Sequence, residues 1–225
     1  MVNQNQTMPG SLITVEGADG AGKTTQLAYI FQWLTNHGIE VVQTREPGGT
    51  ETGDLLREIL LNGKALNISD RAELLMIFAA RQQHLDQVIL PALISGKCVL
   101  SDRFTDATYA YQGGGRGIDA AQIATLENWV QADLRPDLTI VLDIEVALGV
   151  ERSGHRGETE KDRFESQATN FKQAVRQTYL ERAAAEPERM KVVNSAKPIE
   201  VVQSGISALL DTFLQRHKRP TPPAG

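Results

Sequence analysis

Short apolar runs along the chain alternate with longer segments in which apolar residues recur every three or four positions. The short runs predict buried strands, and the spacing of three and four predicts amphipathic helices. Regular alternation of strands and helices indicates a parallel sheet covered on both faces. The predicted fold class is therefore α/β, a three-layer sandwich with helices on both faces of a five-stranded parallel sheet. The predicted strands are residues 12–16, 39–43, 97–101, 138–143 and 190–194.

Helical segments fill the intervals between these strands. Gly38 follows the first of them and is expected to end it. The segment 71–94 has Ser69 before it as a candidate N-cap, and Pro91 within it predicts a kink or a break. This segment has more apolar residues than one face of a helix can hold, so a second apolar face is expected to contact a partner or a ligand. The predicted helices are residues 26–36, 52–61, 71–94, 120–132, 165–185 and 198–215.

The chain has 225 residues, of which 41% are hydrophobic and 23% charged, and its net charge is −5. This length fits one domain with a sizeable core, predicted for residues 11–216 between flexible tails at 1–10 and 217–225. The negative charge argues against a general nucleic-acid-binding surface, which would be basic. No apolar run approaches the ~20 residues of a membrane span. We therefore expect neither nucleic acid nor a membrane as a partner.

One cysteine, Cys98, lies within a predicted strand. A single cysteine cannot form a disulfide within the chain, so a reducing cytoplasm is the expected location. Burial in a strand favours a small hydrophobic side chain over a nucleophile. Residues 1–10 are polar and lack the apolar core of a signal peptide. The four histidines are scattered without the spacing of metal ligands.

A glycine-rich turn joins the first predicted strand to the first predicted helix, in the sequence LITVEGADGAGKTT of residues 12–25. Gly17, Gly22, Lys23 and Thr24 fill the P-loop pattern G-x-x-x-x-G-K-[ST], whose backbone N–H groups cradle phosphates. Lys23 would bridge the terminal phosphates and Thr24 would bind Mg²⁺. An ordinary glycine-rich turn is the alternative, but strand, loop, Lys-Thr and helix occur in the order that the motif requires. The residues predicted to bind a nucleoside triphosphate are Gly17, Ala18, Asp19, Gly20, Ala21, Gly22, Lys23, Thr24 and Thr25.

Charged residues follow other predicted strands, and in open parallel sheets ligands bind at this edge. Arg45 is a candidate anion contact, or else a solvated residue of a Pro-Gly turn. Asp102 is expected near Mg²⁺, unless it caps a helix. Phe78 and Arg81 share a helix face and could stack on and bond a nucleobase. Periodicity alone favours the alternative, in which Phe78 lies in the core and Arg81 in a surface ion pair.

Glycine is concentrated in the sequence YAYQGGGRG of residues 109–117. Tyr111 and Gln112 within it are chemically suited to a sugar and a base. The glycines indicate either close approach of the backbone to a neighbour or turns with positive φ. This segment is therefore a second candidate part of a nucleotide site.

A charged segment follows the fourth predicted strand. Residues 145–157 begin as a helix and continue into a polar, glycine-containing stretch. Residues 151–164 are predicted to be a lid that closes over the phosphates, with Arg152 and Arg156 in it. The alternative is a solvated charged loop, which is the usual structure of such a run.

Together these segments resemble the bacterial thymidylate kinases, which are P-loop nucleoside monophosphate kinases. The P-loop alone is shared by many unrelated enzymes, whereas REPGGT followed by DRF and YQGGGRG in that order is highly specific. The resemblance extends from about residue 11 to 216. The matching segments are VEGADGAGKTT (15–25), TREPGGT (44–50), LLMIFAARQQH (74–84), SDRFTDATYAYQGGGRG (101–117), RPDLTIVLD (135–143) and DRFE (162–165).

The resemblance implies a homodimeric enzyme that transfers the γ-phosphoryl group of ATP to dTMP, giving dTDP and ADP. It implies that Phe78 stacks on thymine, that Arg81 bonds the O4 edge, and that Gln112 approaches the base. Tyr111 would lie under the deoxyribose and Asp19 near its 3′-hydroxyl group. These five residues would form the dTMP site together with the residues that hold its phosphate.

The resemblance also assigns residues to the phosphates and the metal ion. Arg103 and Arg45 would hold the dTMP phosphate, and Asp102 and Glu165 would lie near Mg²⁺ with Thr24. In the bacterial family the lid supplies the catalytic arginine. The lid of this chain departs from many relatives at Gly154, where they carry another basic residue. The residues implied to be catalytic are Lys23, Asp102, Arg103, Arg152 and Arg156.

Other functions of a P-loop protein remain as alternatives. A switch or motor ATPase would need a guanine-reading N-K-x-D or acids placed to polarise water, and the sequence contains no N-K-x-D. A second alternative is a P-loop kinase for a different nucleoside monophosphate, a nucleoside or another small metabolite. Only the resemblance favours a pyrimidine deoxynucleotide, through Phe78, Arg81, Tyr111 and Gln112. A non-catalytic nucleotide-binding subunit is disfavoured by the presence of Lys23, Thr24 and Asp102.

Overall fold

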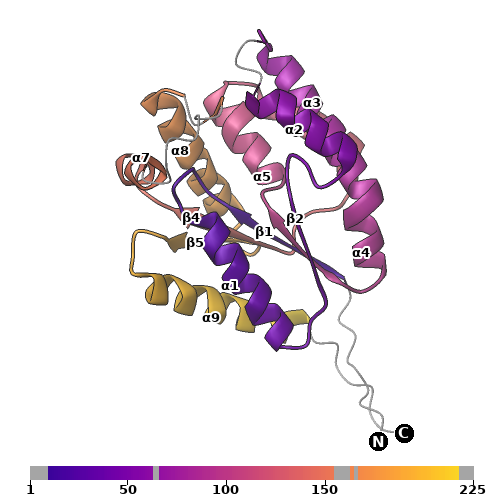
Figure 1. Ribbon diagram of the computed structural model, residues 1–225, viewed down its shortest axis with the longest axis vertical. Helices are drawn as coiled ribbons and strands as arrows, with labels where there is room; N and C mark the ends of the chain where they lie inside the picture. Colours follow the sequence, from indigo (N-terminus) through magenta and orange to yellow (C-terminus); the bar gives the residue numbers. More distant parts are fainter. Residues whose placement is uncertain (1–9, 63–65, 155–162, 165–166, 218–225) are drawn as a thin grey trace, which may run out of the picture.

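The computed structural model describes residues 10–62, 66–154, 163–164 and 167–217. They form an α/β fold in which one sheet lies between layers of helices, as Figure 1 shows. All strands are parallel, in the order β2-β3-β1-β4-β5. The predicted five-stranded α/β sandwich is therefore confirmed. The strands are β1 (Ser11–Glu16), β2 (Val41–Arg45), β3 (Cys98–Asp102), β4 (Leu138–Asp143) and β5 (Met190–Asn194).

The helices cover both faces of this sheet. In Figure 1, α1 and α9 lie on one face, and α3, α4, α5 and α8 lie on the other. No helix in the described ranges is long and apolar enough to cross a membrane. The helical segments are α1 (Lys23–Asn36), α2 (Glu51–Asn62), α3 (Asp70–His84), η2 (Leu85–Ile89), α4 (Leu90–Ile94), α5 (Thr105–Thr108), η3 (Tyr109–Gly115), α6 (Ala120–Gln131), α7 (Val146–Gly154), α8 (Thr169–Ala185) and α9 (Ile199–His217), where η2 and η3 are π-helical.

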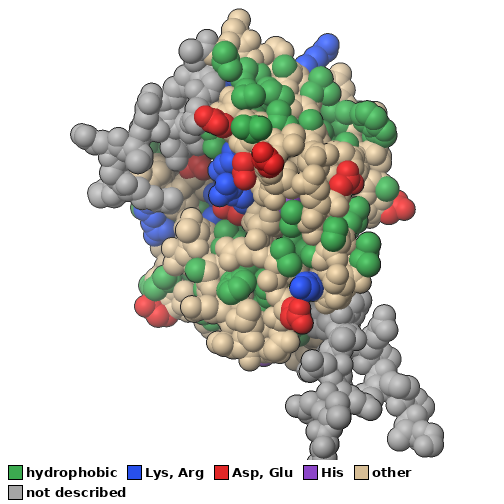
Figure 2. All heavy atoms as spheres, turned by 45° about the vertical axis from the view of Figure 1, so that its right-hand side comes forward, with side chains coloured by type: hydrophobic (Ala, Val, Ile, Leu, Met, Phe, Trp, Pro, Cys, Tyr) green, Lys and Arg blue, Asp and Glu red, His purple; other side chains and the backbone are tan. Residues whose placement is uncertain are grey.

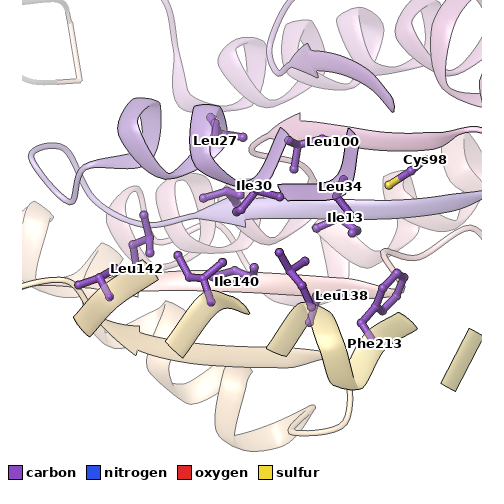
Figure 3. Close-up of a cluster of buried hydrophobic side chains, with 14 of the residues drawn as sticks. Ile13, Leu27, Ile30, Leu34, Cys98, Leu100, Leu138, Ile140, Leu142 and Phe213 are labelled. Atoms are coloured by element: carbon purple, nitrogen blue, oxygen red, sulfur yellow. The ribbon is translucent and has the colours of Figure 1, made fainter. Parts of the chain in front are cut away.

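The main core fills the space between the sheet and the layer of α1 and α9 (Figure 3). Leu27, Ile30 and Leu34 lie three and four residues apart on α1, so they project from one face toward Ile13 of β1. Phe213 reaches the same core from α9. Full burial of such a side chain stabilises the fold by about 1.5–3 kcal/mol. The core thus fixes β1 against α1, and with them the P-loop that joins the two.

The second strand begins two residues later than the predicted segment 39–43. Gly38 does end α1, with a φ of 76°. The backbone N–H of Ile39 still donates to the carbonyl of Leu34, so the chain cannot become extended at this point. Arg45, which was expected in a loop, is consequently the last residue of β2.

Pro91 does not break the long helical segment predicted for residues 71–94. α3 continues through η2 into α4 without interruption. Proline has no N–H to bond the carbonyl four residues earlier, and the π-helical turn η2 comes directly before it. The widened turn accommodates the missing hydrogen bond. Two other differences from the predicted helices are found. Residues 105–115, which were not predicted to be helical, form α5 and η3, and α8 begins later than expected, at Thr169.

Candidate active site

A cavity of about 260 Å³ opens at the carboxyl ends of β1 and β3, where the P-loop begins. It is the place at which an open parallel sheet binds ligands. The P-loop residues Gly17, Ala18, Ala21 and Thr25 are not among its lining residues. The predicted site residues that line it are Asp19, Gly20, Gly22, Lys23, Thr24, Arg81, Asp102, Arg103, Tyr111 and Gln112.

Lys23 lies inside the curl of the P-loop. Its Nζ donates to the carbonyl oxygens of Gly17 and Ala18, at 3.0 and 3.1 Å. Burial, and then the nearby Arg103, lower the pKa of this ammonium group to about 8. An anion bound in the loop would favour the charged form again. The geometry therefore suits Lys23 to bind phosphate.

The P-loop is also in backbone contact with α7. A Cβ atom at Gly20 would overlap the carbonyl oxygen of Gly149. A Cβ atom at Gly149 would lie 2.8 Å from the carbonyl oxygen of Asp19, and Gly20 has a φ of 79°. Both positions therefore require glycine in this packing.

Arg103 places its guanidinium beside the P-loop from a left-handed backbone conformation, with a φ of 72°. Such a conformation costs about 1–3 kcal/mol in a residue other than glycine. NH1 donates to the carbonyl of Gly17 at 3.0 Å and to the Tyr179 hydroxyl at 3.3 Å. NH2 donates to Asp19 at 3.1 Å, and the guanidinium lies 4.8 Å from the ring centre of Tyr111. These contacts aim the cation of Arg103 into the cavity.

A buried carboxyl group stands behind Arg103. The two oxygens of Glu16 accept hydrogen bonds from the Phe104 N–H and the Tyr179 hydroxyl, both at 2.7 Å. Burial, and then the charge of Asp106, raise the pKa of Glu16 to about 8. Sequence reasoning missed Glu16 and Tyr179, because the contact joins residues far apart in the chain. The network links β1 and α8 to the position of Arg103.

Asp102 and Thr24 offer oxygen atoms to a cation. The Oδ1 atom of Asp102 is buried and has no hydrogen-bond partner among the residues that the structure describes. Buried carboxylate oxygens rarely lack a partner, and oxygen is the ligand that Mg²⁺ prefers. The helix-cap alternative for Asp102 is wrong, since Phe104 is the N-cap of α5. The donor set fits Mg²⁺, and Glu165 lies outside the described residues.

Arg81 lies in the wall of the cavity and is only 2% exposed. Its Nε donates to Glu46 at 2.7 Å, and its NH2 donates to the Thr108 hydroxyl at 2.9 Å. Burial opposes the charge of Glu46, but the Arg81 guanidinium and His84 together hold the pKa of this carboxyl below its usual value. Arg81 is thus in a buried ion pair, and the surface ion pair considered from periodicity is wrong.

Ile77, and not Phe78, lines the described part of the cavity. Phe78 is 3% exposed and packs in a cluster with Leu74 and Ile123. This is the core position that periodicity favoured. The thymine-stacking role implied for Phe78 stays a prediction, while Ile77 provides an apolar wall.

Arg45 does not line the cavity, whereas Arg57 does. The Arg45 side chain is 55% exposed and pairs with Asp54 at 3.1 Å. Arg57, on α2, donates to the carbonyl of Pro47 at 2.9 Å. The Glu46–Pro47 bond is cis. Sequence reasoning missed Arg57, because one arginine on an amphipathic helix is ordinary.

The glycine-rich segment forms η3 and brings Tyr111 and Gln112 to the cavity. Both predicted reasons for its glycines are found. A Cβ atom at Gly114 or Gly115 would overlap side chains of α8, and Gly117 has a φ of 75°. Close packing against α8 therefore determines where Gln112 lies.

The lid predicted for residues 151–164 is described only at its ends. Arg152 does not line the cavity, and its NH1 donates to the carbonyl of Ser195 at 2.8 Å. Arg156 lies outside the described residues. Phe164, at the far end of the segment, does line the cavity. The catalytic roles of Arg152 and Arg156 remain predictions.

Comparisons of the sequence and of the structure with known proteins find the same family. A family model described as thymidylate kinase matches residues 15–206. The thymidylate kinase of Pseudomonas fluorescens (strain SBW25) is 53% identical over 209 residues, which are 93% of this chain and 99% of the relative. That of Neisseria gonorrhoeae (strain NCCP11945) is 52% identical over 91% of this chain and 98% of its own. The crystal structure of thymidylate kinase from Ehrlichia chaffeensis is similar with a TM-score of 0.73 and 32% identity, covering 89% and 98% of the two chains.

Proposed function

Since the chain belongs to the thymidylate kinase family and transfers the γ-phosphoryl group of ATP to dTMP, we propose how its cavity carries out this reaction. One observation supports the assignment above all. A single cavity joins the P-loop ammonium of Lys23, the guanidinium of Arg103 and the buried guanidinium of Arg81. The first two suit phosphates, and the third suits the edge of a base. ATP binds at the P-loop and dTMP lies between Arg103 and Arg81.

The chemistry is an in-line transfer between phosphates. An oxygen of the dTMP phosphate attacks the γ-phosphorus of ATP, and the bond to the β,γ-bridging oxygen breaks, releasing ADP. This attacking oxygen is already anionic near pH 7, since the second pKa of a phosphate monoester is about 6, and no strong general base is needed. Arg103 and Arg57 hold the acceptor phosphate in place, and Lys23 offsets the charge on the transferred group. Lid arginines Arg152 and Arg156 are proposed to add to this charge.

Asp102 and Thr24 are the groups that we propose to hold Mg²⁺, with Glu165 as a further candidate. The ion would neutralise charge on the phosphates of ATP. The buried Oδ1 atom of Asp102, which has no hydrogen-bond partner among the described residues, supports this assignment.

The remaining residues of the cavity suit the nucleoside. Tyr111 would pack under the deoxyribose, and Asp19 would lie near the 3′-hydroxyl group. Phe78 would stack on thymine, as the resemblance implies, and Ile77 in the cavity wall would add apolar contact with the base. Arg81 would donate to O4 of thymine, and Gln112 would bond its edge. The roles of Tyr111, Asp19, Arg81 and Gln112 are those that the family resemblance implies, and the presence of these side chains in the cavity wall supports them.

The assay that tests this function measures ADP release from ATP and Mg²⁺ with dTMP, dUMP, dCMP, AMP, GMP or no acceptor. We expect turnover to depend on a monophosphate and to be fastest with dTMP. ADP release that is equally fast with and without an acceptor would indicate a P-loop ATPase instead of a kinase. A preference for another monophosphate would preserve the phosphate chemistry and refute the roles of Arg81 and Gln112.

We also propose that the enzyme is a homodimer that pairs through α2 and α3. Leu55 and Ile59 of α2 and Leu75 of α3 are exposed by 60%, 40% and 56%, although α2 packs against α3. Figure 2 brings this side forward and shows hydrophobic side chains gathered on it. Such a face is suited to a two-fold interface with a second copy.

The dimer predicts a specific effect of charge on this face. Leu75→Glu is expected to yield a monomer in size-exclusion chromatography with light scattering, because the interface would bury an unpaired charge. Val201→Glu, at a residue of α9 that is 55% exposed, is the matched control and should remain dimeric. A wild-type protein with the mass of one chain at micromolar concentration would contradict the proposal.

The cytoplasm is our proposed location. Cys98 is buried, and burial raises the pKa of its thiol to about 11. A protein whose one cysteine is an inert thiol does not depend on an oxidising compartment.

A further inference from the structure

Glu73 of α3 is a fully buried carboxyl group behind the cavity wall, with an exposure of 0%. One of its oxygens accepts from Nε2 of Gln112 at 2.8 Å. Arg116 donates to both oxygens at 3.2 Å, and Arg163 also donates to it. A carboxylate between two guanidinium groups accepts hydrogen bonds and donates none. Any group that bonds Glu73 must therefore be a donor.

This environment decides which end of the Gln112 amide faces the cavity. Only the NH2 group of a glutamine can donate, so it is the NH2 group that bonds Glu73. The other branch of the amide, the carbonyl oxygen, has no hydrogen-bond partner among the described residues. Gln112 itself lines the cavity. The protein thus presents an acceptor at this point of the wall.

Arg81, in the same wall, has the opposite character. A guanidinium has five N–H donors and no acceptor. Glu46, Gln131 and Thr108 accept one hydrogen bond each from its Nε, NH1 and NH2 on the protein side, and two N–H donors remain. The wall therefore offers both a donor and an acceptor to the edge of a base. Thymine and uracil carry a carbonyl oxygen next to a ring N–H, which match this pair. Cytosine carries an amino group next to an unprotonated ring nitrogen. Its amino group would meet the donor of Arg81, and its ring nitrogen has no hydrogen to donate to the acceptor of Gln112.

We propose that Glu73 is a positioning residue that sets base selectivity, by holding Gln112 so that its carbonyl oxygen accepts the ring N–H of the substrate. The inference rests on the proposed dTMP site. Glu73 touches neither substrate nor reacting phosphate and acts through Gln112. Its contacts with Arg116 and Arg163 stabilise the protein but do not distinguish one pyrimidine from another. The ratio of kcat/KM for dTMP to that for dCMP is therefore the readout that separates the two roles.

The first test is Glu73→Gln, a change of nearly equal size. The new amide can donate as well as accept, so Gln112 is free to turn either end toward the base. We expect the dTMP/dCMP ratio of kcat/KM to fall about tenfold or more, since one mismatched buried polar group has about this effect. The KM for ATP should remain unchanged. An unchanged ratio in a folded Glu73→Gln enzyme would overturn the proposal.

The exchanged pair Glu73→Gln, Gln112→Glu supplies the second test. It keeps one carboxylate and one amide in the cluster, and the total charge is unchanged. The carboxylate at position 112 can only accept, whichever way it turns, so the dTMP/dCMP ratio should return to within about threefold of wild type. If Glu73→Gln does not fold, the exchanged pair still tests the proposal by itself. An exchanged enzyme that fails to distinguish dTMP from dCMP would refute the inference.

Arg116→Lys is the matched control. It weakens the paired hydrogen bonds to the same carboxylate but leaves Glu73 facing Gln112. We expect a lower melting temperature and an unchanged dTMP/dCMP ratio. A ratio that falls as far as in Glu73→Gln would show that general loosening of the cluster is responsible, which also overturns the proposal. A wild-type enzyme that does not use dTMP would instead refute the proposed function itself.

Discussion

Replacing Lys23 with methionine is expected to lower kcat for dTMP phosphorylation about a thousandfold, the effect typical of removing one preorganised transition-state donor. The Nζ atom lies within the P-loop, 3.0 Å from the carbonyl oxygen of Gly17, and lines the cavity with Arg103. Methionine keeps the length of the side chain and removes its charge. The measurement is steady-state ADP release with saturating ATP, Mg²⁺ and dTMP.

The control for this change is Lys97→Met. Lys97 is partly exposed and pairs with Glu40 at 3.4 Å, outside the cavity. Exposed ion pairs contribute little, so this variant should have wild-type kcat. A Lys23→Met enzyme within tenfold of wild type would show that Lys23 does not stabilise the transferred phosphate.

The largest loss of stability is expected for Asp106→Asn, with a decrease of about 3–5 kcal/mol in the free energy of unfolding. Asp106 is 1% exposed. Its oxygens accept from Arg182 Nε at 2.8 Å and from Arg189 NH1 at 2.6 Å. The neutral amide would remove the buried charge that both guanidinium groups share, leaving them only the half-exposed Glu186 as an ionic partner. Urea denaturation at pH 7 measures the change.

The same experiment at lower pH provides a second check on Asp106. Burial raises the pKa of this carboxyl, but hydrogen bonds and charges of Arg189 and Arg182 outweigh it and bring the pKa below the usual value. Its contribution is therefore complete above the unfolded pKa of 3.8 and is lost as pH falls through the lower folded pKa. The difference between wild type and variant should shrink below about pH 4.

Asp211→Asn is the matched control for Asp106. Asp211 lies on the exposed side of α9, where the free energy of unfolding should change by less than ~0.5 kcal/mol. A loss below ~1 kcal/mol in Asp106→Asn would contradict the structural role of the buried ion pairs.

The strands and the P-loop could be predicted from sequence because their signals are local. A buried parallel strand is a largely apolar run, as Leu138–Asp143 shows, and its predicted bounds agree with the structure. The residues of the P-loop pattern lie within a few positions of one another in the sequence, so the pattern can be recognised without knowledge of the fold. β2 was placed two residues too early, because its start depends on the hydrogen bond of Ile39 that closes the turn after α1.

The wall of the cavity was harder to predict, because it depends on distant contacts and on the rotation of helices. Phe78 and Ile77 are adjacent on α3, so a rotation of about 100° decides which of them faces the cavity. Periodicity does not fix that rotation in a helix with apolar residues on several faces. Glu73 and Arg57 look like ordinary polar positions of amphipathic helices. Their significance comes from partners elsewhere in the chain, which no local pattern contains.

The contact between Gly20 and Gly149 has a consequence for protein engineering. Gly149 lies inside α7, where exchanging glycine for alanine is a standard route to a more thermostable enzyme, worth about 0.4–1 kcal/mol at a compatible site. Here the added methyl group would lie 2.8 Å from the carbonyl oxygen of Asp19. The substitution would raise helix propensity but would displace the P-loop, which we propose to bind ATP. Attempts to make this enzyme more thermostable should therefore keep glycine at both positions.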